Sequence, residues 1–362
     1  MDRREFLRSA GVISAGLSFP ITRKLFASSS ASQEWRRFEV TTRVEVLKPS
    51  GATRIWLPAA LIVETPFQRT IANRWECRGG SSTILEQTQD GLGIVTARFP
   101  AGAQPALTLT SVIAIRDYSV NLSAPTHAPQ LSRAELEYHL RPTKLLPTDG
   151  IVRQTALEIT RGQKSEFAKA LCIYEWIIDN TFRDPKVRGC GVGNIRGLLE
   201  SRNLGGKCAD LNALFVGLAR AAGLPARNVY GIRIAKSKLG YQSLGASTAN
   251  VTKAQHCRAE VYLNGHGWVP VDPADVRKVV LEEPPSNRSL DNESVKQART
   301  RLFGSWEMNW MAFNFAHDVA LPGSDGPTLG FFMYPQAETA QGRLDSLDPE
   351  NFRYEIMATE LV

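Results

Sequence analysis

Residues 205–223 read GGKCADLNALFVGLARAAG, and Leu224 and Pro225 follow them. Apolar side chains recur every three or four positions after Cys208, which is the spacing of one helix face. They are Leu211, Leu214, Phe215, Leu218 and Ala222. Gly223 and Pro225 are typical of the residues that end a helix. The pattern predicts a buried helix that begins at Cys208.

The place of Cys208 at the start of this helix favours a reactive thiolate. The first N–H groups of a helix lack intrahelical partners, and the helix dipole puts partial positive charge there. Both effects lower the pKa of a thiol, and the thiolate is its nucleophilic form. The backbone N–H of Cys208 is the natural oxyanion donor. Gly206, Lys207 and Trp268 are further candidates for substrate binding or for the oxyanion site.

A hairpin that carries a histidine and an aspartate is predicted at 256–272. Its two runs flank the segment 263–265, Leu-Asn-Gly, which fits a three-residue loop with glycine in the left-handed position. In that register paired residue numbers sum to 528, so His256 faces Asp272. Opposed residues have Cβ atoms about 4.5–5.5 Å apart, which lets a carboxylate orient an imidazole. Cys257 points to the other face, and we reject it as the nucleophile.

Each of these residues also has an ordinary structural interpretation. Taken alone, Cys208 fits a small core residue, His256 a plain strand histidine and Asp272 a strand-ending turn. Together they favour covalent acyl transfer, because that chemistry uses a thiolate, an imidazole and a carboxylate. We assign Asp210 to complementing the helix N-terminus rather than to chemistry.

The rest of the chain indicates an α+β architecture. Residues 34–118 alternate between apolar and polar positions and predict an N-terminal antiparallel β domain. Residues 119–163 are expected to be a connection and residues 164–281 the catalytic core. Residues 282–362 are expected to be a C-terminal extension that completes this core. The 362 residues, 43% of them hydrophobic, are enough to bury a large core.

The N-terminus has the pattern of an export signal. Residues 2–8, DRREFLR, resemble the twin-arginine motif, and a weakly apolar stretch and a small-residue zone follow them. We expect residues 1–31 to be a signal peptide, cleaved after Ala31 or Ala27, that engages the twin-arginine export machinery. The protein would then be periplasmic or secreted. No second apolar run of about 18 residues appears, so we predict no permanent membrane anchor.

Charge and cysteine content argue against several other classes of protein. Residues 1–31 contribute +3 of the net charge of +7, and no dense Lys/Arg run follows, which disfavours nucleic-acid binding. The five cysteines show no CxxC motif and no zinc-ligand spacing, so neither a metal nor a cofactor is expected. An odd number leaves at least one thiol unpaired, a role assigned to Cys208. Disulfides involving Cys77, Cys190 or Cys257 stay open.

Several blocks of the chain together resemble the transglutaminase-like superfamily. In the family's order they are residues 206–215, 220–227, 256–261 and 267–273. The resemblance covers about 165–280 and implies a papain-like α+β core in which a cysteine-bearing helix packs on an antiparallel sheet. It also implies that Cys208 is the nucleophile, His256 the general base and Asp272 its orienting group. The family often has tryptophan just after the histidine, whereas this chain has Cys257 and Arg258 there.

We therefore predict an exported thiol enzyme that acts on amide bonds through a thioester acyl-enzyme. Water as the acceptor makes it a peptidase or amidase, and an amine makes it a cross-linking transamidase. Hydrolysis is preferred, because water is abundant outside the membrane. The expected substrate is a peptide or protein, with cell-wall peptide a candidate by location alone. The rival from another class is a non-catalytic binding module on the same scaffold.

Overall fold

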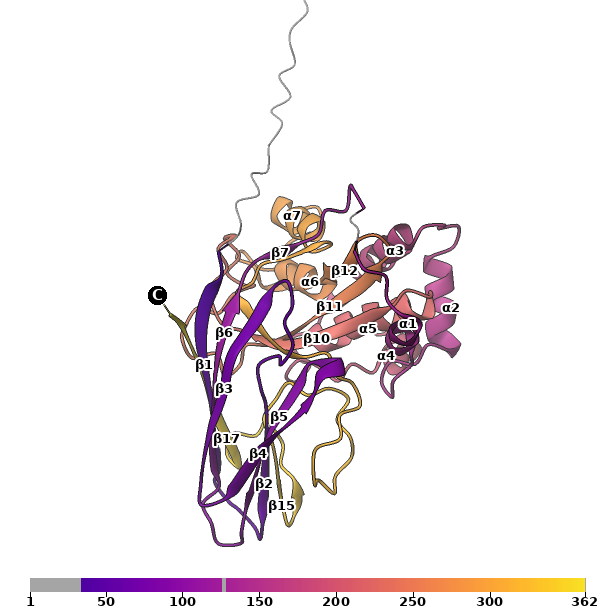
Figure 1. Cartoon of the computed structure of the whole chain (residues 1–362). Coiled ribbons are helices and arrows are strands. Elements are labelled where there is room, and N and C mark those ends of the chain that lie inside the picture. The colour runs from indigo at the N-terminus through magenta and orange to yellow at the C-terminus, as the bar shows by residue number, and fades with distance from the viewer. Residues whose placement is uncertain (1–33, 126–127, 362) are drawn as a thin grey trace, which may run out of the picture. The chain divides into compact units, whose positions relative to one another are not determined.

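The structure is a computed structural model that describes residues 34–125 and 128–361 (Figure 1). The expected signal peptide, residues 1–31, lies outside these ranges. Residues 34–362 form one compact unit. Within the described ranges, no helix combines the length and the apolar character needed to cross a membrane.

Two antiparallel sheets form the N-terminal β region. Their strands are β1 Arg36–Val46, β2 Thr53–Pro58, β3 Gln68–Arg78, β4 Ser81–Gln87, β5 Leu92–Phe99, β6 Ala106–Ile115, β15 Gln336–Thr339, β16 Gly342–Arg343 and β17 Phe352–Leu361. One sheet has the order β17-β1-β6-β3 and the other β16-β15-β2-β5-β4. Val44, Leu57 and Phe352 belong to one core shared by both sheets. The predicted antiparallel β domain is confirmed.

A separate antiparallel sheet carries the candidate site. It has the strands β10 Ala226–Arg233, β11 Gln255–Leu263, β12 Gly267–Val271 and β14 Trp310–Asn314, in the order β12-β11-β10-β14. Helix α5, Cys208–Ala221, packs against β10 and β11 (Figure 1). Almost all of α5 is buried, and Gly223 follows it with a left-handed φ of 84°. The predicted helix therefore begins and ends where its sequence pattern indicates.

The remaining helices pack against α5, except α7, which packs against α6. They are α1 Arg133–Leu140, α2 Gly150–Ile159, α3 Glu166–Asn180, α4 Ile195–Ser201, α6 Pro273–Glu282 and α7 Glu293–Arg301. Short elements are β7 Tyr118–Ser119, β8 Phe182–Arg183, β9 Gly205–Gly206, β13 Ser305–Trp306 and a 3-10 turn at Thr88–Asp90. Helix α6 starts directly after Asp272, a residue whose ordinary structural interpretation is a strand-ending turn.

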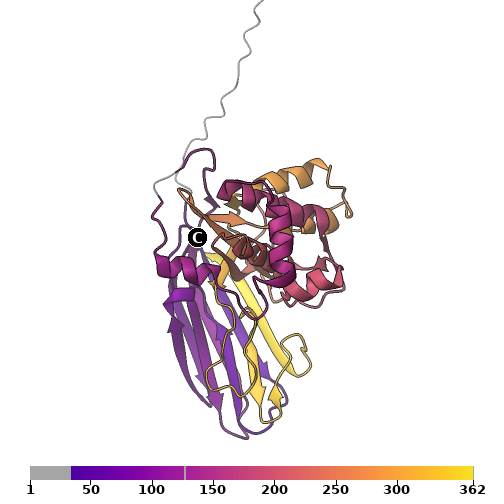
Figure 2. The same cartoon turned by 90° about the vertical axis from the view of Figure 1, so that its right-hand side faces the viewer.

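The C-terminal segment contributes to both parts of the unit. β14 pairs with β10, whereas β15 pairs with β2 and β17 pairs with β1. Figure 2 shows the yellow C-terminal strands beside the indigo N-terminal ones. The ring of Phe67 also contacts Trp306, with centroids 5.5 Å apart. The C-terminal segment thus supplies strands to the β region and to the sheet that packs against α5.

The β11–β12 hairpin has a different register from the predicted one. Leu263 pairs with Gly267, so paired numbers sum to 530 rather than 528, and the loop is 264–266. Both Gly265 (φ 80°) and Gly267 (φ 75°) adopt left-handed conformations, whereas the prediction used only the first. A shift of two residues keeps every side chain on its face. Asp272 therefore stays on the side of His256 but lies diagonally to it rather than opposite.

Candidate active site

Cys208 is the first residue of α5, and its side chain lines a cavity although it is only 3% exposed. The N–H groups of the next three residues already donate to the carbonyl oxygens of Cys190 and Lys207, at 2.9–3.1 Å. The N–H of Cys208 is the remaining donor of this first turn, where a helix supplies no partner of its own. The nucleophile candidate thus carries a backbone N–H that has no acceptor among the residues the structure describes.

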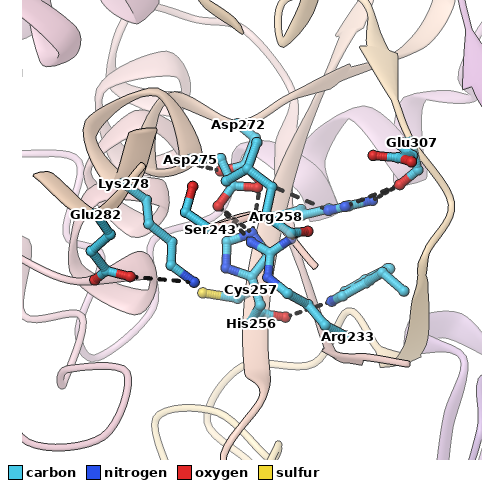
Figure 3. Close-up of polar contacts among 12 residues, drawn as sticks. Arg233, Ser243, His256, Cys257, Arg258, Asp272, Asp275, Lys278, Glu282 and Glu307 are labelled. Atoms are coloured by element: carbon cyan, nitrogen blue, oxygen red, sulfur yellow. Dashed lines mark hydrogen bonds and ion pairs between the residues drawn. The ribbon is translucent and has the colours of Figure 1, made fainter. Parts of the chain in front are cut away.

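The imidazole of His256 is held by carboxylates from the start of α6. Its Nε2 lies 2.7 Å from Oδ2 of Asp272 and 3.4 Å from Oδ1 of Asp275 (Figure 3). Because these groups engage Nε2, Nδ1 is the ring nitrogen left to face the thiol. The structure therefore brings His256 and Asp272 together, and it adds Asp275, which the sequence patterns do not single out.

Asn212 links the cysteine-bearing helix to this carboxylate. Its buried Nδ2 donates to Oδ1 of Asp272 at 3.1 Å and to the carbonyl oxygen of Cys257 at 2.7 Å. Asn212 comes four residues after Cys208, so both lie on one helix face. That spacing of a polar residue inside an apolar helix is the signal that identifies it.

Three thiols gather at this end of α5, and only one of them is favoured to ionise. Hydrogen bonds from Cys190 and Cys257 and the contact with His256 hold the pKa of Cys208 well below its usual value, although burial opposes them. The hydrogen bond to Cys208 and burial raise the pKa of Cys190. Burial and the hydrogen bond to Cys208 raise that of Cys257. All five cysteines are free.

The histidine is favoured in its charged form. Burial and the charge of Arg233 lower the pKa of His256, but Asp275 and Asp272 outweigh them and raise it above its usual 6.5. Burial and the charge of Asp275 raise the pKa of Asp272, while His256 and Arg258 oppose the rise. A lowered thiol pKa beside a raised imidazole pKa favours a thiolate–imidazolium pair.

A buried arginine occupies the position where the related family often has tryptophan. Nε of Arg258 lies 3.7 Å from Oδ2 of Asp272. Its guanidinium stacks on Trp310 at 4.8 Å and on Trp306 at 5.3 Å. Nε1 of Trp310 donates to the carbonyl oxygen of His256 at 2.9 Å. Tryptophans from the C-terminal segment therefore pack beside the histidine strand.

The histidine and the two carboxylates also form a candidate cation cluster. The ligand atoms of His256, Asp272 and Asp275 lie within 4.8 Å of one another. Asp275, however, already pairs with Arg233 at 2.6 Å, and Asp272 with His256 at 2.7 Å. Positive groups thus balance the negative charge, so the cluster fits an ion-pair network better than a metal site.

The glycine-rich loop 188–193 is fixed to α5 by Asp210. Oδ1 of Asp210 accepts from the N–H groups of Val192 at 3.0 Å and Gly193 at 2.9 Å. A Cβ atom at Gly191 would lie 1.8 Å from Oδ2 of Asp210, and its φ is 92°. Only glycine fits this approach without a shift of the chain. Asp210 lies in the first turn, as predicted, and it also anchors this loop.

A cavity of about 510 Å³ opens over Cys208 and His256. Its walls come from the glycine-rich loop, the segment before β11, α6 and the C-terminal region with Tyr334, Phe352 and Tyr354. The volume lies in the range of small-molecule and side-chain sites. The thiol and the imidazole thus face one shared space.

The secondary candidates are placed differently. Lys207 lines the cavity, whereas Gly206 lies in β9 next to it and is absent from the lining residues. Trp268 lies outside the cavity lining and packs against His139, with centroids 4.7 Å apart, and under Arg227 at 4.1 Å. The structure does not bring Trp268 to this cavity, because β12 carries it toward the hairpin turn.

Gln255, directly before His256, lines the cavity and is missing from the sequence prediction. Its Nε2 is buried and has no hydrogen-bond partner within the described residues. A buried donor without an acceptor is rare. No spacing pattern in the sequence marks this residue.

Comparisons with known proteins agree with this fold. The family model described as transglutaminase-like superfamily matches residues 153–273. A Haemophilus influenzae protein described as uncharacterized is 35% identical over 342 residues, covering 90% of this chain and 91% of that protein. The structure of a proposed cysteine protease from Cytophaga hutchinsonii aligns with a TM-score of 0.55 at 15% identity, over 91% of this chain and 92% of that one.

A more distant structure is the periplasmic domain of TgpA from Pseudomonas aeruginosa. It aligns with a TM-score of 0.33 at 21% identity, over 67% of this chain and 90% of that domain. The motif order, the cysteine-bearing helix on an antiparallel sheet and the family match lead to one assignment. The chain belongs to the transglutaminase-like superfamily.

Proposed function

We propose that the protein is an exported thiol enzyme that acts on amide bonds through Cys208, His256 and Asp272. The observation that carries the proposal is a thiol with a lowered pKa that shares one cavity with an imidazole, itself held by a carboxylate at 2.7 Å. Covalent acyl transfer requires a nucleophile next to a base, and a further group that orients the base.

In the first half-reaction, the thiolate of Cys208 attacks the carbonyl carbon of the amide and forms a carbon–sulfur bond. The carbonyl electrons move to oxygen. The imidazolium of His256 then gives its proton to the amide nitrogen, the carbon–nitrogen bond breaks, and the amine leaves. A thioester on Cys208 remains. Asp272 keeps the imidazole oriented throughout by holding Nε2.

The backbone N–H of Cys208 is the oxyanion donor in this scheme. Among the described residues, no carbonyl oxygen accepts a hydrogen bond from it. Loss of one such donor typically costs about 10²–10³ in kcat.

The second half-reaction decides between hydrolysis and transamidation. In hydrolysis, His256 takes a proton from water, the hydroxide attacks the thioester carbon, and the acid leaves with regeneration of the Cys208 thiolate. An amine in place of water gives a new amide. We favour hydrolysis, because water outside the membrane exceeds any amine.

The proposed location follows from the N-terminal sequence. Residues 2–8 carry the twin-arginine pattern, and the proposed route is export by that machinery to the periplasm or the medium. Peptides or proteins are the proposed substrates, and cell-wall peptide is a candidate because it is present in that location.

The test incubates the purified protein with glutamine-rich or cell-wall peptides and an isotope-labelled amine. Mass spectrometry then distinguishes release of the acid from incorporation of the amine, with Cys208→Ser as the matched control. Alkylation of Cys208 at near-neutral pH, slowed in His256→Ala, is the parallel assay. If neither product forms and Cys208 alkylates no faster than a free thiol, the binding-module interpretation replaces the enzyme.

A further inference from the structure

The cavity over Cys208 has a one-sided charge. No described residue that lines it is acidic. Its cationic lining residues are Arg183, Arg188, Lys207, Arg233, Lys253 and Lys278. A concave site lined by one sign of charge focuses the electrostatic field and raises the local concentration of ions of opposite charge.

Nearby carboxylates balance only part of this charge. Arg233 pairs with Asp275 and Arg188 with Asp345, while Glu282 is shared between Arg183 and Lys278. Among the described residues, Lys207 and Lys253 take part in none of the ion pairs. The cavity therefore keeps an excess of positive charge beside the nucleophile.

Lys278 is a largely buried cation whose only ion pair among the described residues is long. It projects from α6, the helix that also supplies Asp275, and its side chain is 18% exposed (Figure 3). Its ammonium lies 3.7 Å from Glu282, a loose ion pair. Burial and the charge of Arg233 lower the pKa of Lys278. A confined ammonium with incomplete compensation is stabilised by an additional anion.

We propose that the substrate carries a carboxylate close to the scissile amide bond, and that Lys207 and Lys278 bind this carboxylate and determine specificity. The inference rests on the proposed function, since it places the carboxylate in the cavity that Cys208 and His256 share. The carboxylate belongs either to the acyl part of the substrate or to the departing amine part. Peptides that differ in charge on one side of the scissile amide distinguish these two cases.

The first test uses a pair of alkylating reagents of nearly equal size. Iodoacetate is anionic and iodoacetamide is neutral, and both attach to the Cys208 sulfur with loss of iodide. For Cys208, the rate constant with iodoacetate is divided by the rate constant with iodoacetamide. This ratio is then divided by the same ratio for N-acetylcysteine, and the resulting quotient isolates the effect of the reagent's charge. We expect this quotient to be about ten or more at low salt, because the cationic cavity attracts iodoacetate, and to fall as ionic strength rises.

Lys207→Met and Lys278→Met should each lower the quotient, and Lys296→Met, at an exposed site on α7, should leave it unchanged. A quotient near one with a reactive Cys208 overturns this inference and leaves the proposed function standing. A Cys208 that reacts with both reagents no faster than N-acetylcysteine overturns both. If Lys278→Met does not fold, the change in the quotient is measured for Lys207→Met, because Lys207 is only half-buried.

The second test compares peptides that share one scissile amide. One set has Glu or Gln on the acyl side, and the other has a free or amidated carboxyl terminus on the amine side. We expect a roughly tenfold higher kcat/KM for the carboxylate on one of the two sides, lost in Lys207→Met. Equal kcat/KM for acid and amide in both sets contradicts the inference even when turnover itself is observed.

Discussion

Nε2 of His256 lies 2.7 Å from Oδ2 of Asp272, although the hairpin register pairs neither residue with the other. Asp272 is the N-cap of α6, and its Oδ1 accepts from the N–H of Asp275 and from Nδ2 of Asn212, both at 3.1 Å. One carboxylate oxygen is thus fixed by two helices while the other holds the imidazole. The start of α6 therefore positions the orienting group.

Asp272→Asn should separate these two roles. Asparagine is as good a helix cap as aspartate, so α6 should keep its start. The amide supplies no negative charge to hold the imidazolium, and we expect kcat to fall by about 10³–10⁴. Turnover of the peptide substrate and thermal unfolding are measured together. Asp291→Asn, at an exposed site, is the control, and a loss of less than tenfold at Asp272 would argue against the triad.

Asn212→Ala should impair the site without touching the nucleophile. It removes the side-chain donor to the carbonyl oxygen of Cys257 and one of the two donors to Oδ1 of Asp272, which costs about 1–3 kcal/mol of unfolding free energy. It also frees the carboxylate to rotate, so the pH profile of Cys208 alkylation should shift as well.

Asn228→Ala is the matched control, because Asn228 is also buried but neither of its side-chain polar atoms has a partner within the described residues. Urea unfolding reports the stability of both variants. An unchanged alkylation profile in Asn212→Ala would limit this residue to a structural role.

Local patterns account for the parts of the fold that were predicted. The helix from Cys208 has its apolar spacing, its terminating glycine and its starting cysteine within one stretch of the chain. The β1 strand alternates buried and exposed residues because one of its faces packs on the opposite sheet. Such signals need no knowledge of distant residues.

Long-range packing accounts for what was missed. With Gly267 in a left-handed conformation, the hairpin register differs by two residues from the predicted one. Because a shift of two residues leaves each side chain on the same face of the sheet, Asp272 still lies beside His256. Trp310 reaches the carbonyl of His256 from 54 residues away in the chain. Gln255 lines a cavity whose walls come from segments far apart in the chain. None of these relationships has a periodicity or motif in the sequence.

The pH dependence of Cys208 alkylation should differ from that of an ordinary cysteine. The pKa of Cys208 is lowered, so the thiolate persists as pH falls below the usual value near 9.0 until that lowered pKa is passed. The pKa of His256 is raised, so the imidazolium persists as pH rises past 6.5. The ion pair therefore exists between the lowered thiol pKa and the raised imidazole pKa.

Iodoacetamide rates measured across pH should show reactivity that persists at lower pH than that of a free thiol. His256→Ala should move the rise toward the pH of a free thiol, because the imidazolium no longer stabilises the thiolate. The neutral reagent avoids any direct effect of the cationic cavity on the reagent. A profile in the unaltered protein that matches N-acetylcysteine would contradict the ion pair.

Gly191→Ala should disturb both stability and reactivity, because the loop and the nucleophile helix meet at Asp210. The added Cβ would lie 1.8 Å from Oδ2 of Asp210 at a φ of 92°. Gly79→Ala is the matched control, since Gly79 also has a left-handed φ, 74°, but no atom lies within 4 Å of a Cβ there. The control should lose about 1–2 kcal/mol of unfolding free energy from backbone strain alone.

Gly191→Ala should lose more unfolding free energy, measured by urea unfolding. It should also slow the alkylation of Cys208, because displacing Asp210 shifts the first turn of α5 against the glycine-rich loop. Equal losses in the two variants, with unchanged alkylation, would show that the loop does not help to position the nucleophile.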